Sequence, residues 1–462
     1  MSEIRPYVAG VDSSTQSCKV IIVDPATGEI VREGRAPHPD GTEVDPENWW
    51  QAFLRAVEMA GGLEDVGAIS VGGQQHGMVC LDSNGSVIRP ALLWNDTRSA
   101  PQATSLVREA GSGDEVTGAK WWADAVGSVP VASLTVTKLR WLADNEPENA
   151  SRIAAVCLPH DWLTWRIQGS SDLTSLATDR SDASGTGYTN REVEIAGTSG
   201  VDSAGGYRRD ILAQALLCPP EVAAKIILPR ILGPKEVAGY GDPARGWGDI
   251  VLGPGCGDNA GAALGIGLKS GEAMLSLGTS GVVAAVAEHS IVDPSGLVTG
   301  FADATGRWLP LACTLNASRI IDAMAAITGL SYGEFDAMAL SAEDAGGLVL
   351  VPYFEGERTP NLPDATASLE GMTLSNADQA HVARATVEGL LNLMRGALDA
   401  VRATDVPIKA VHMVGGGAKS SAVQVLAPTL LGVDTELPIA REYVALGAAK
   451  QAADVLLGLD LN

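Results

Sequence analysis

The sequence predicts an α/β protein built from two domains. Short apolar runs typical of strands alternate with longer amphipathic stretches typical of helices along all 462 residues. That length exceeds what a single hydrophobic core serves, and it fits two or three domains of ordinary size. With 46% hydrophobic and 19% charged residues, the chain can bury a large core, which excludes a disordered or collagen-like protein.

The first half opens with a hairpin, because two β-rich runs at residues 7–24 flank the polar turn DSSTQS. The elements expected after it are an amphipathic helix at 46–60, a buried strand at 68–71, a strand–turn–strand segment GGQQHGMVCLD at 72–82, helices at 135–145 and 162–167, and an irregular Ser- and Gly-rich stretch with short strands at 169–206.

The second half repeats this design, because EAMLSLGTSGVVAAVAE (272–288) again places two apolar strands around a small polar turn. The elements expected around it are a strand at 250–252, a turn at 253–259, a helix of small residues at 260–268, a strand ending in glycines at 411–417 and a helix at 418–432. Two copies of a hairpin-led unit predict two homologous domains that face a cleft, at 1–268 and 269–462.

The charge balance excludes two classes of partner. A net charge of −24, from 32 basic and 56 acidic residues, repels nucleic-acid backbones and anionic lipid surfaces. We therefore expect neither nucleic acid nor a membrane as a partner. Backbone amides or a metal ion can still bind an anion locally, so a phosphorylated small molecule stays open as a ligand.

Cysteine and histidine usage indicates a cytoplasmic protein without zinc. The six cysteines are scattered singly, which is typical of free thiols in a reducing cytosol. The sequence shows no signal peptide and no apolar run of about 18 residues, so we expect a soluble protein. Six histidines without HExxH or paired ligand spacing make a zinc centre an unfavourable interpretation. The oligomeric state stays open, with a homodimer as one option.

The two polar hairpin turns are candidate phosphate sites. A turn of Ser, Thr and Gly gathers backbone amides and hydroxyls in one place, and glycine lets the backbone approach a phosphate closely. The alternative is that both are ordinary hairpin loops, for which the same residues are usual. If the turns bind a polyphosphate, Asp12 in the first turn is a candidate magnesium ligand. No GxxxxGK[ST] motif is present, which excludes a P-loop enzyme.

Three consecutive glycines, at residues 415–417, mark a strand-to-helix junction in the second half. Such a junction leaves space for a flat ligand or a phosphate at the start of the helix. It does not fit the GxGxxG spacing of a dinucleotide site, and a tight packing turn is the alternative.

Asp258 is the residue we single out for chemistry. It follows a glycine-rich turn and precedes a helix of small residues, so it is either an N-cap or a functional acid. Amide dipoles at a helix start keep a carboxylate ionised, which suits a base that accepts a hydroxyl proton. The local sequence does not decide between these alternatives.

Two polar segments suit a small polar ligand such as a sugar. Gln74, Gln75 and His76 follow a buried strand, and strand ends are where α/β sheets bind ligands. The WND step at 94–96 adds an aromatic ring. Trp162 and Trp165 could stack on a sugar, although core packing is the usual role of such residues.

Two longer segments resemble the signatures of the FGGY family of carbohydrate kinases. They are SLTVTKLRWLADN (133–145) and ASLEGMTLSNADQAHVARATVE (367–388). Within that family, GQQHGMVCLD, PALLWNDTRS, LPHDWLTWRIQG and TDRSDASGT (178–186) are similar to the xylulokinase group. The resemblance covers nearly the whole chain.

The resemblance implies two actin-like ATPase (ribonuclease H-like) domains that face a central cleft, with ATP and Mg²⁺ as cofactors. It implies transfer of a phosphoryl group to D-xylulose. The residue roles that it implies are Asp258 as the catalytic base, Gln75, His76, Asp258 and Asn259 as sugar ligands, Asp12 at magnesium, Thr15, Gly278 and Thr279 at the phosphates, and Gly415, Gly416, Gly417, Ala418 and Ser421 at the adenosine.

Two other functions stay open. One is a kinase of the same family that acts on ribulose, xylitol or glycerol. The other is an actin-like ATPase without sugar kinase activity, which the polar QQHG and WND segments make less favourable.

Overall fold

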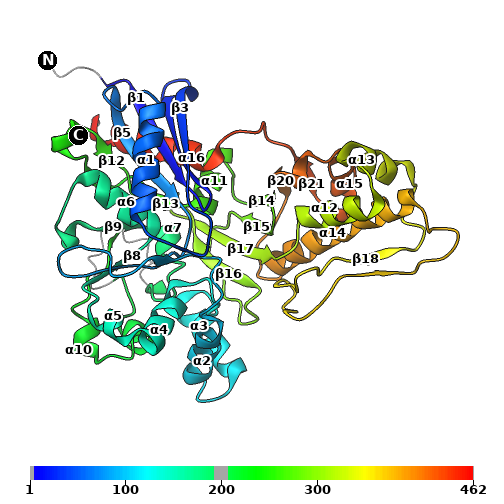
Figure 1. Cartoon of the computed structure of the whole chain (residues 1–462), viewed down its shortest axis with the longest axis horizontal. Helices are drawn as coiled ribbons and strands as arrows, with labels where there is room; N and C mark the ends of the chain where they lie inside the picture. Colours follow the sequence, from blue (N-terminus) through cyan, green and yellow to red (C-terminus); the bar gives the residue numbers. More distant parts are fainter. Residues whose placement is uncertain (1–4, 192–205, 461–462) are drawn as a thin grey trace. The chain divides into compact units, whose positions relative to one another are not determined.

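The computed structural model describes residues 5–191 and 206–460, and the chain forms two compact units (Figure 1). The first unit comprises Met1–Gly267, Phe301–Arg307 and Glu442–Asn462, and the second comprises Leu268–Gly300 and Trp308–Arg441. The change of unit after Gly267 lies next to the division expected at 268/269. The expected second domain is not contiguous, however, because two of its segments pack with the first unit. That the domains face a cleft stays a prediction.

The first unit is built on a mixed sheet in the order β11-β12-β5-β1-β2-β3, with β13 beside β5. β1 is antiparallel to β2, and β2 to β3, whereas β5 lies parallel to both β1 and β12. The strands are β1 (Tyr7–Ser13), β2 (Ser17–Asp24), β3 (Glu29–Pro37), β5 (Val66–Gly73), β11 (Gly239–Tyr240), β12 (Val251–Leu252) and β13 (Cys256–Gly257). The expected opening hairpin is confirmed.

The second unit repeats this arrangement in the order β16-β17-β15-β14-β20-β21. The β14–β15 and β15–β17 pairs are antiparallel, and β20 lies parallel to β14 and β21. The strands are β14 (Glu272–Leu277), β15 (Gly281–Ala285), β16 (Val298–Ala302), β17 (Trp308–Thr314), β20 (Ala410–Val414) and β21 (Asp434–Glu436). Both sheets therefore share a five-strand order of three antiparallel strands followed by two parallel ones.

Helices cover both faces of the first sheet (Figure 1). Side chains alternate along β1, so that Val8 packs toward the C-terminal helix α16 (Tyr443–Asp460) while Ala9 and Val11 pack on the opposite side. That opposite side is covered by the aromatic residues of α1 (Glu47–Met59). α16 lies very close to β1, since a Cβ atom at Gly10 would fall 1.9 Å from the carbonyl oxygen of Ala445. This contact explains why the end of the chain belongs to the first unit.

The other elements of the first unit are short strand pairs and helices. The pairs are β4 (Glu43–Val44) with β7 (Ala91–Leu92), β6 (Val79–Leu81) with β8 (Ala155–Cys157), and β9 (Ala177–Asp179) with β10 (Arg230–Leu232). The helices are α2 (Ala100–Ala110), α3 (Glu115–Val126), α4 (Thr135–Asn145), α5 (Pro147–Ser151), α6 (Pro159–Gln168), α7 (Arg180–Ala183), α9 (Arg209–Ala215), α10 (Pro220–Ala223) and α11 (Asp258–Ile266), with 3₁₀ turns η1 (Leu173–Ser175) and η2 (Pro243–Arg245).

The expected helices at 46–60, 135–145 and 162–167 are confirmed, the second with the same bounds as α4. The stretch expected to be irregular at 169–206 contains η1, β9 and α7, and its residues 192–205 lie outside the described residues. Of the helices in the described residues, none is long and apolar enough to cross a membrane.

The second unit packs around its longest helix, α14. Polar side chains fix helix starts in this unit: Asp378 accepts a hydrogen bond from the backbone of His381, and Ser420 accepts one from Val423. The elements are α12 (Ser318–Thr328), α13 (Tyr332–Ser341), α14 (Gln379–Arg402), α15 (Ser421–Leu431), the 3₁₀ turn η3 (Gly417–Lys419), and the pair β18 (Val349–Val351) with β19 (Ser368–Glu370).

Candidate functional site

Strand register brings the predicted acids to one edge of the first sheet. Asp12 lies near the end of β1, opposite Gly72 of the parallel strand β5. The short strand β13 also runs parallel to β5, with Gly257 opposite Gly73. Since parallel strands end at the same edge, the residues that follow β5 and β13 meet there. Asp258 follows β13 directly, and the QQHG loop (residues 74–77) follows β5.

Asp258 is hydrogen-bonded to Asn259, which in turn is hydrogen-bonded to Gln75; both partners are predicted sugar ligands. It is the first residue of α11, and Gly257 is the N-cap, so the N-cap interpretation of Asp258 is wrong. Its Oδ1 accepts hydrogen bonds from the backbone N–H of Asn259 (2.8 Å) and from Asn259 Nδ2 (3.1 Å). Asn259 Nδ2 also donates to Gln75 Oε1, at 2.9 Å. Gln75, from a distant part of the sequence, thus joins the adjacent residues Asp258 and Asn259 in one hydrogen-bonded group.

The two acids at this edge hold their protons more tightly than usual. Burial raises the pKa of Asp258 to about 7, with a further rise from the negative charge of Asp12. Burial also raises the pKa of Asp12 to about 6, against the hydrogen bond from Ser14 and the positive charge of Lys19, which lower it. A carboxylate that titrates near neutral pH is suited to accept a proton in catalysis.

His76 adopts an unusual backbone conformation. Its φ is +67°, in the left-handed region, and the residue is 7% exposed. The carbonyl oxygen of His76 accepts hydrogen bonds from Thr135 Oγ1 and Lys138 Nζ, both at 3.2 Å. Its backbone N–H donates to Asp182 Oδ1 at 3.2 Å.

These partners were not singled out individually from the sequence. Thr135 and Lys138 lie in the segment 133–145, and Asp182 lies in the segment 178–186. Both segments carried the family resemblance, so the signal was present, but nothing in the local sequence connected them to the QQHG loop.

Thr15 lies beside the QQHG loop as well. Its hydroxyl is 3.5 Å from Gln74 Oε1 and accepts a hydrogen bond from Trp94 Nε1 at 2.9 Å. The Trp94 side chain is partly exposed. Trp162 and Trp165 belong instead to the hydrophobic core, so the sugar-stacking interpretation of these two residues is not supported.

In the second unit, the predicted phosphate turn lies next to a helix start. Gly278 and Thr279 form the turn between β14 and β15. The carbonyl oxygen of Gly278 accepts a hydrogen bond from the backbone N–H of Ser318, the first residue of α12, at 2.9 Å. Thr279 is exposed. The turn is therefore held against the start of α12 through Gly278, while Thr279 is accessible to solvent.

A cavity of about 530 Å³ opens beside the glycine junction of the second unit, which is a usual size for a small-molecule site. It is lined by Ser318, Ile321, Asp322, Tyr332, Gly333, Asp336, Gly416, Gly417, Lys419 and Ser420. Two of the predicted adenosine residues, Gly416 and Gly417, are among these. The residues from α12 and α13 were missed from the sequence, because no element was predicted over 318–341.

The first two glycines of the junction differ in what surrounds them. Gly415 has φ +92°, and a Cβ atom there would lie 2.7 Å from the carbonyl oxygen of Leu277. At Gly416, by contrast, a Cβ atom would meet no protein atom within 4 Å. The first glycine is needed for the turn itself, whereas the second leaves the cavity open.

Ala418 and Ser421 do not line the cavity. The Ser421 hydroxyl donates to Asp336 Oδ2 (3.1 Å), and the backbone N–H of Ser421 donates to the same oxygen at 2.7 Å. Ser420 Oγ donates to Asp336 Oδ1 at 2.6 Å. The structure thus gives Ser421 a part in holding the start of α15 against α13, and its contact with a nucleotide stays a prediction.

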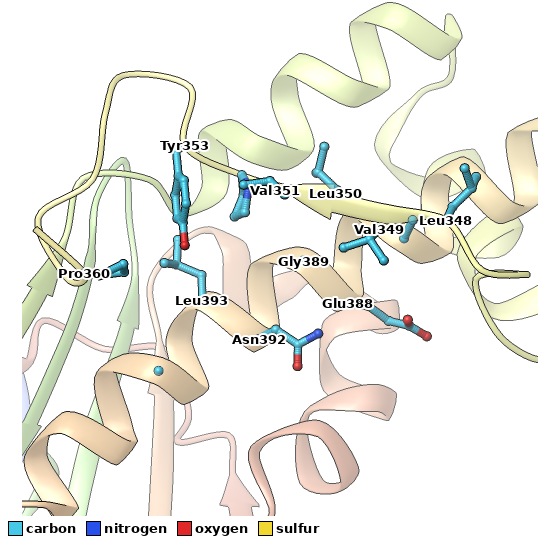
Figure 2. A pocket seen from close by; sticks show the side chains of 13 residues that line it. Leu348, Val349, Leu350, Val351, Tyr353, Pro360, Glu388, Gly389, Asn392 and Leu393 are labelled. Atoms are coloured by element: carbon cyan, nitrogen blue, oxygen red, sulfur yellow. The ribbon is translucent and has the colours of Figure 1, made fainter. Parts of the chain in front are cut away.

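A second cavity, of about 280 Å³, lies between β18 and α14 (Figure 2). Figure 2 shows Val349, Glu388 and Asn392 around it, with Tyr353 and Leu393 at one end. None of the predicted catalytic or ligand-binding residues lines this cavity, although Ala385 and Glu388 belong to the segment 367–388.

Comparison with known proteins decides the family. A model of the N-terminal domain of the FGGY family of carbohydrate kinases matches residues 7–194, and a model of its C-terminal domain matches residues 273–454. The chain belongs to the FGGY family of carbohydrate kinases. The resemblance seen in the sequence is therefore confirmed, and family membership implies a sugar and ATP as substrates.

Individual relatives agree with this assignment. The xylulose kinase of Streptomyces coelicolor is 45% identical over 98% of this chain and 89% of its own length. The crystal structure of xylulose kinase from Bifidobacterium adolescentis is 50% identical and has a TM-score of 0.91, covering 99% of this chain and 94% of that chain. Plasmodium falciparum glycerol kinase with ADP is 20% identical, with a TM-score of 0.83 over 99% of this chain and 90% of that chain, which shows a shared fold. The actin-like, two-domain FGGY fold is confirmed.

Proposed function

We propose that this FGGY kinase transfers the terminal phosphoryl group of ATP to the C5 hydroxyl of D-xylulose, giving ADP and D-xylulose 5-phosphate. The observation that carries the proposal is the hydrogen-bonded group of Asp258, Asn259 and Gln75 beside His76. Relatives named xylulose kinase at 45% and 50% identity support the choice of sugar.

Asp258 is the proposed general base. Its raised pKa, about 7, lets it exist as a carboxylate at neutral pH and still accept the hydroxyl proton as the new P–O bond forms. Gln75, His76 and Asn259 would hydrogen-bond the other hydroxyls and the carbonyl of the ketose. Because phosphoryl transfer passes through a loose transition state, most of the acceleration comes from such positioning and from charge neutralisation.

The cavity of the second unit is the proposed adenosine site. Gly416 and Gly417 form one wall of it and leave the space that a flat base needs. Gly278 and Thr279, in the neighbouring turn, would bind phosphate oxygens through backbone N–H groups and a hydroxyl. Thr15 would do the same in the first unit, and Gly415, Ala418 and Ser421 would act by shaping the junction.

The residues at the first sheet edge fit a magnesium ion. Asp12 and Asp258 offer carboxylate oxygens, which Mg²⁺ prefers, and their mutual repulsion raises the pKa of Asp258 when no cation neutralises it. Asp12 would hold the ion, directly or through water. When bound, the ion would neutralise charge on the phosphates of ATP. We also place the reaction in the cytoplasm, where ATP is supplied and where the six free thiols stay reduced.

A coupled assay of ADP release tests the proposal. D-Xylulose is compared with D-ribulose, xylitol, glycerol and a blank without sugar, at saturating ATP and Mg²⁺. We expect kcat/KM for D-xylulose to exceed every other value by at least about tenfold. A higher kcat/KM with another sugar would assign that sugar instead, and sugar-independent ATP hydrolysis would favour the actin-like ATPase alternative.

A further inference from the structure

A buried cluster of charged side chains lies beneath the QQHG loop. His160, on α6, places its Nε2 3.3 Å from Asp161 Oδ1, 3.4 Å from Asp179 Oδ1 and 3.5 Å from Asp182 Oδ2. The side chains of these residues are at most 4% exposed. Burial by itself would lower the pKa of His160, but the three carboxylates raise it to about 9. The three acids therefore favour the protonated imidazole, while burial raises the pKa of Asp182 itself well above its usual value.

One of the three acids also contacts a predicted sugar ligand. Asp182 Oδ2 is the oxygen near His160, whereas Asp182 Oδ1 accepts the hydrogen bond from the backbone N–H of His76. The same Oδ1 lies 3.9 Å from His76 Nδ1. Asp161 has no such connection, because its Oδ2 accepts a hydrogen bond from the backbone of Leu158. Asp182 is thus the member of the cluster that links His160 to the QQHG loop.

The conformation of His76 needs this support. A residue other than glycine at φ +67° is held in a sparsely populated region, and such conformations persist where surrounding contacts determine them. Asp182 binds the N–H of His76 from one side, and Thr135 and Lys138 bind its carbonyl from the other. The direction of the imidazole ring follows from this backbone conformation.

The ring itself has little freedom. A Cβ atom at Gly185 would lie 2.2 Å from His76 Cε1, so glycine there lets the chain pass directly against the imidazole. Phe301 packs on the ring with the centroids 5.2 Å apart. Small changes in the backbone of His76 would therefore alter which ring atoms a bound sugar meets.

Asp182 lies on the short helix α7, and this helix also contacts the residue that precedes the proposed base, Asp258. Ser181, beside Asp182 on α7, accepts at its Oγ a hydrogen bond from the backbone N–H of Gly257, at 3.0 Å. Gly257 precedes Asp258. Asp179 caps α7 by accepting from the backbone N–H groups of Ser181 and Asp182. α7 thus contacts both sides of the proposed sugar site through consecutive residues.

We propose that Asp182 is a positioning residue for the sugar: held by His160, it fixes the backbone of His76 in the conformation that presents the imidazole to the ketose. This inference rests on the proposed function, because it takes His76 as a sugar ligand. Asp182 does not itself touch the substrate in this scheme. It acts on sugar binding and leaves the nucleotide site of the second unit unaffected.

The test compares Asp182→Asn with the matched variant Asp161→Asn. Each replaces one of the three carboxylates around His160 by an amide of the same size. In Asp182→Asn the new NH₂ group must face either the N–H of His76 or that of His160, so a donor opposes a donor. In Asp161→Asn the same conflict arises without involving His76.

We expect Asp182→Asn to raise the KM for D-xylulose at least about tenfold, with the KM for ATP within about twofold of wild type. Asp161→Asn should change the sugar KM by less than about threefold, while both variants lower the melting temperature to a similar extent. A sugar KM near wild type in Asp182→Asn overturns the inference. An equal rise in both variants also overturns it, since the cluster would then act only through overall stability.

A second variant keeps the test decisive if Asp182→Asn does not fold. Asp182→Glu retains a carboxyl group beside His160 but displaces its oxygens from the N–H of His76. We expect the same selective rise in the sugar KM, and an unchanged sugar KM overturns the inference. Failure of the wild-type enzyme to phosphorylate D-xylulose would instead count against the proposed function, so the two outcomes are distinguishable.

Discussion

The two units share a strand order but carry different chemistry at equivalent strand ends. In the first unit, the opening hairpin contains Asp12, and the fourth strand of the shared order, β5, leads to the QQHG loop. In the second unit, the hairpin turn LGTSG has no acid, and the equivalent strand, β20, leads to three glycines. The fold determines where strand ends meet, whereas the residue types at those ends determine what can bind there. At these strand ends, the first unit carries acidic and amide side chains. The second unit carries glycines beside a cavity.

Removal of the proposed base should give the largest effect. We expect Asp258→Ala to lower kcat by a factor of about 100 or more, while sugar binding survives in weakened form. The reason is that the variant loses the proton acceptor but keeps Gln75, His76 and Asn259. ADP release measures kcat, and calorimetric titration measures sugar binding. Near-normal turnover would mean that Asp258 is not the base. The first unit would then not be distinguished from the second by supplying the catalytic base.

Narrowing the second-unit cavity should affect the nucleotide alone. Gly416 has helical φ and ψ of −63° and −43°, and a Cβ atom there meets no protein atom, so Gly416→Leu occupies cavity space without backbone strain. We expect the KM for ATP to rise about tenfold and the KM for D-xylulose to stay within about twofold.

Gly396→Leu is the matched control for this prediction. Gly396 lies on α14 and lines the second cavity rather than the one beside the glycine junction, and a Cβ atom there also meets no protein atom within 4 Å. We expect wild-type KM values for both substrates in this variant. An unchanged ATP KM in Gly416→Leu would mean that the cavity is not the nucleotide site.

The pH dependence of kcat/KM for the sugar should reflect the ionisation of Asp258 in the first unit. Because burial raises the pKa of Asp258, we expect kcat/KM for the sugar to be constant at high pH and to fall about tenfold per pH unit once the pH drops below the pKa of this acid, which bound Mg²⁺ would lower. The sign follows from the role of a base, which must be ionised to accept a proton. Initial rates at limiting sugar between pH 5 and about 9 measure this limb. An acid limb that persists in Asp258→Ala would belong to another group.

The smallest expected effect is on stability. The pKa of Asp258 rises from 3.8 to about 7 on folding, so the folded state binds this proton more tightly than the unfolded state. Its contribution to stability is therefore complete below the lower value and is lost as the pH rises toward about 7. Asp258→Asn, which is always neutral, should melt at a higher temperature than wild type at about pH 8. The difference should shrink toward about pH 5, and a difference independent of pH would contradict the prediction.

Local patterns predicted the elements well where burial and periodicity agree. The hairpins at 7–24 and 272–288 and the helix at 135–145 are found as expected, because alternation and a 3.6-residue period specify them without help from distant residues. The helix at 443–460 was not assigned to the first unit. Its packing depends on Gly10, more than four hundred residues away in sequence, and no local pattern records such a contact.

The candidate site was predicted only in part, for the same reason. Asp12, Asp258 and the QQHG loop stood out because polar residues follow apolar strands, and that is a local signal. Asp182 and His160 lie in segments that carried the family resemblance, but the local sequence did not indicate that they are buried together beside His76. The lining residues from α12 and α13 were also missed.

The sequence by itself determined the fold class, the repeated hairpin unit, the family and the polar groups that follow each strand, because residue type and spacing are enough to specify local structure. Tertiary structure alone decided that Asn259 joins Asp258 to Gln75, that the last helix belongs to the first unit, and that His76 is supported by Asp182. Those contacts depend on strand register and on burial, which arise only when distant segments pack together.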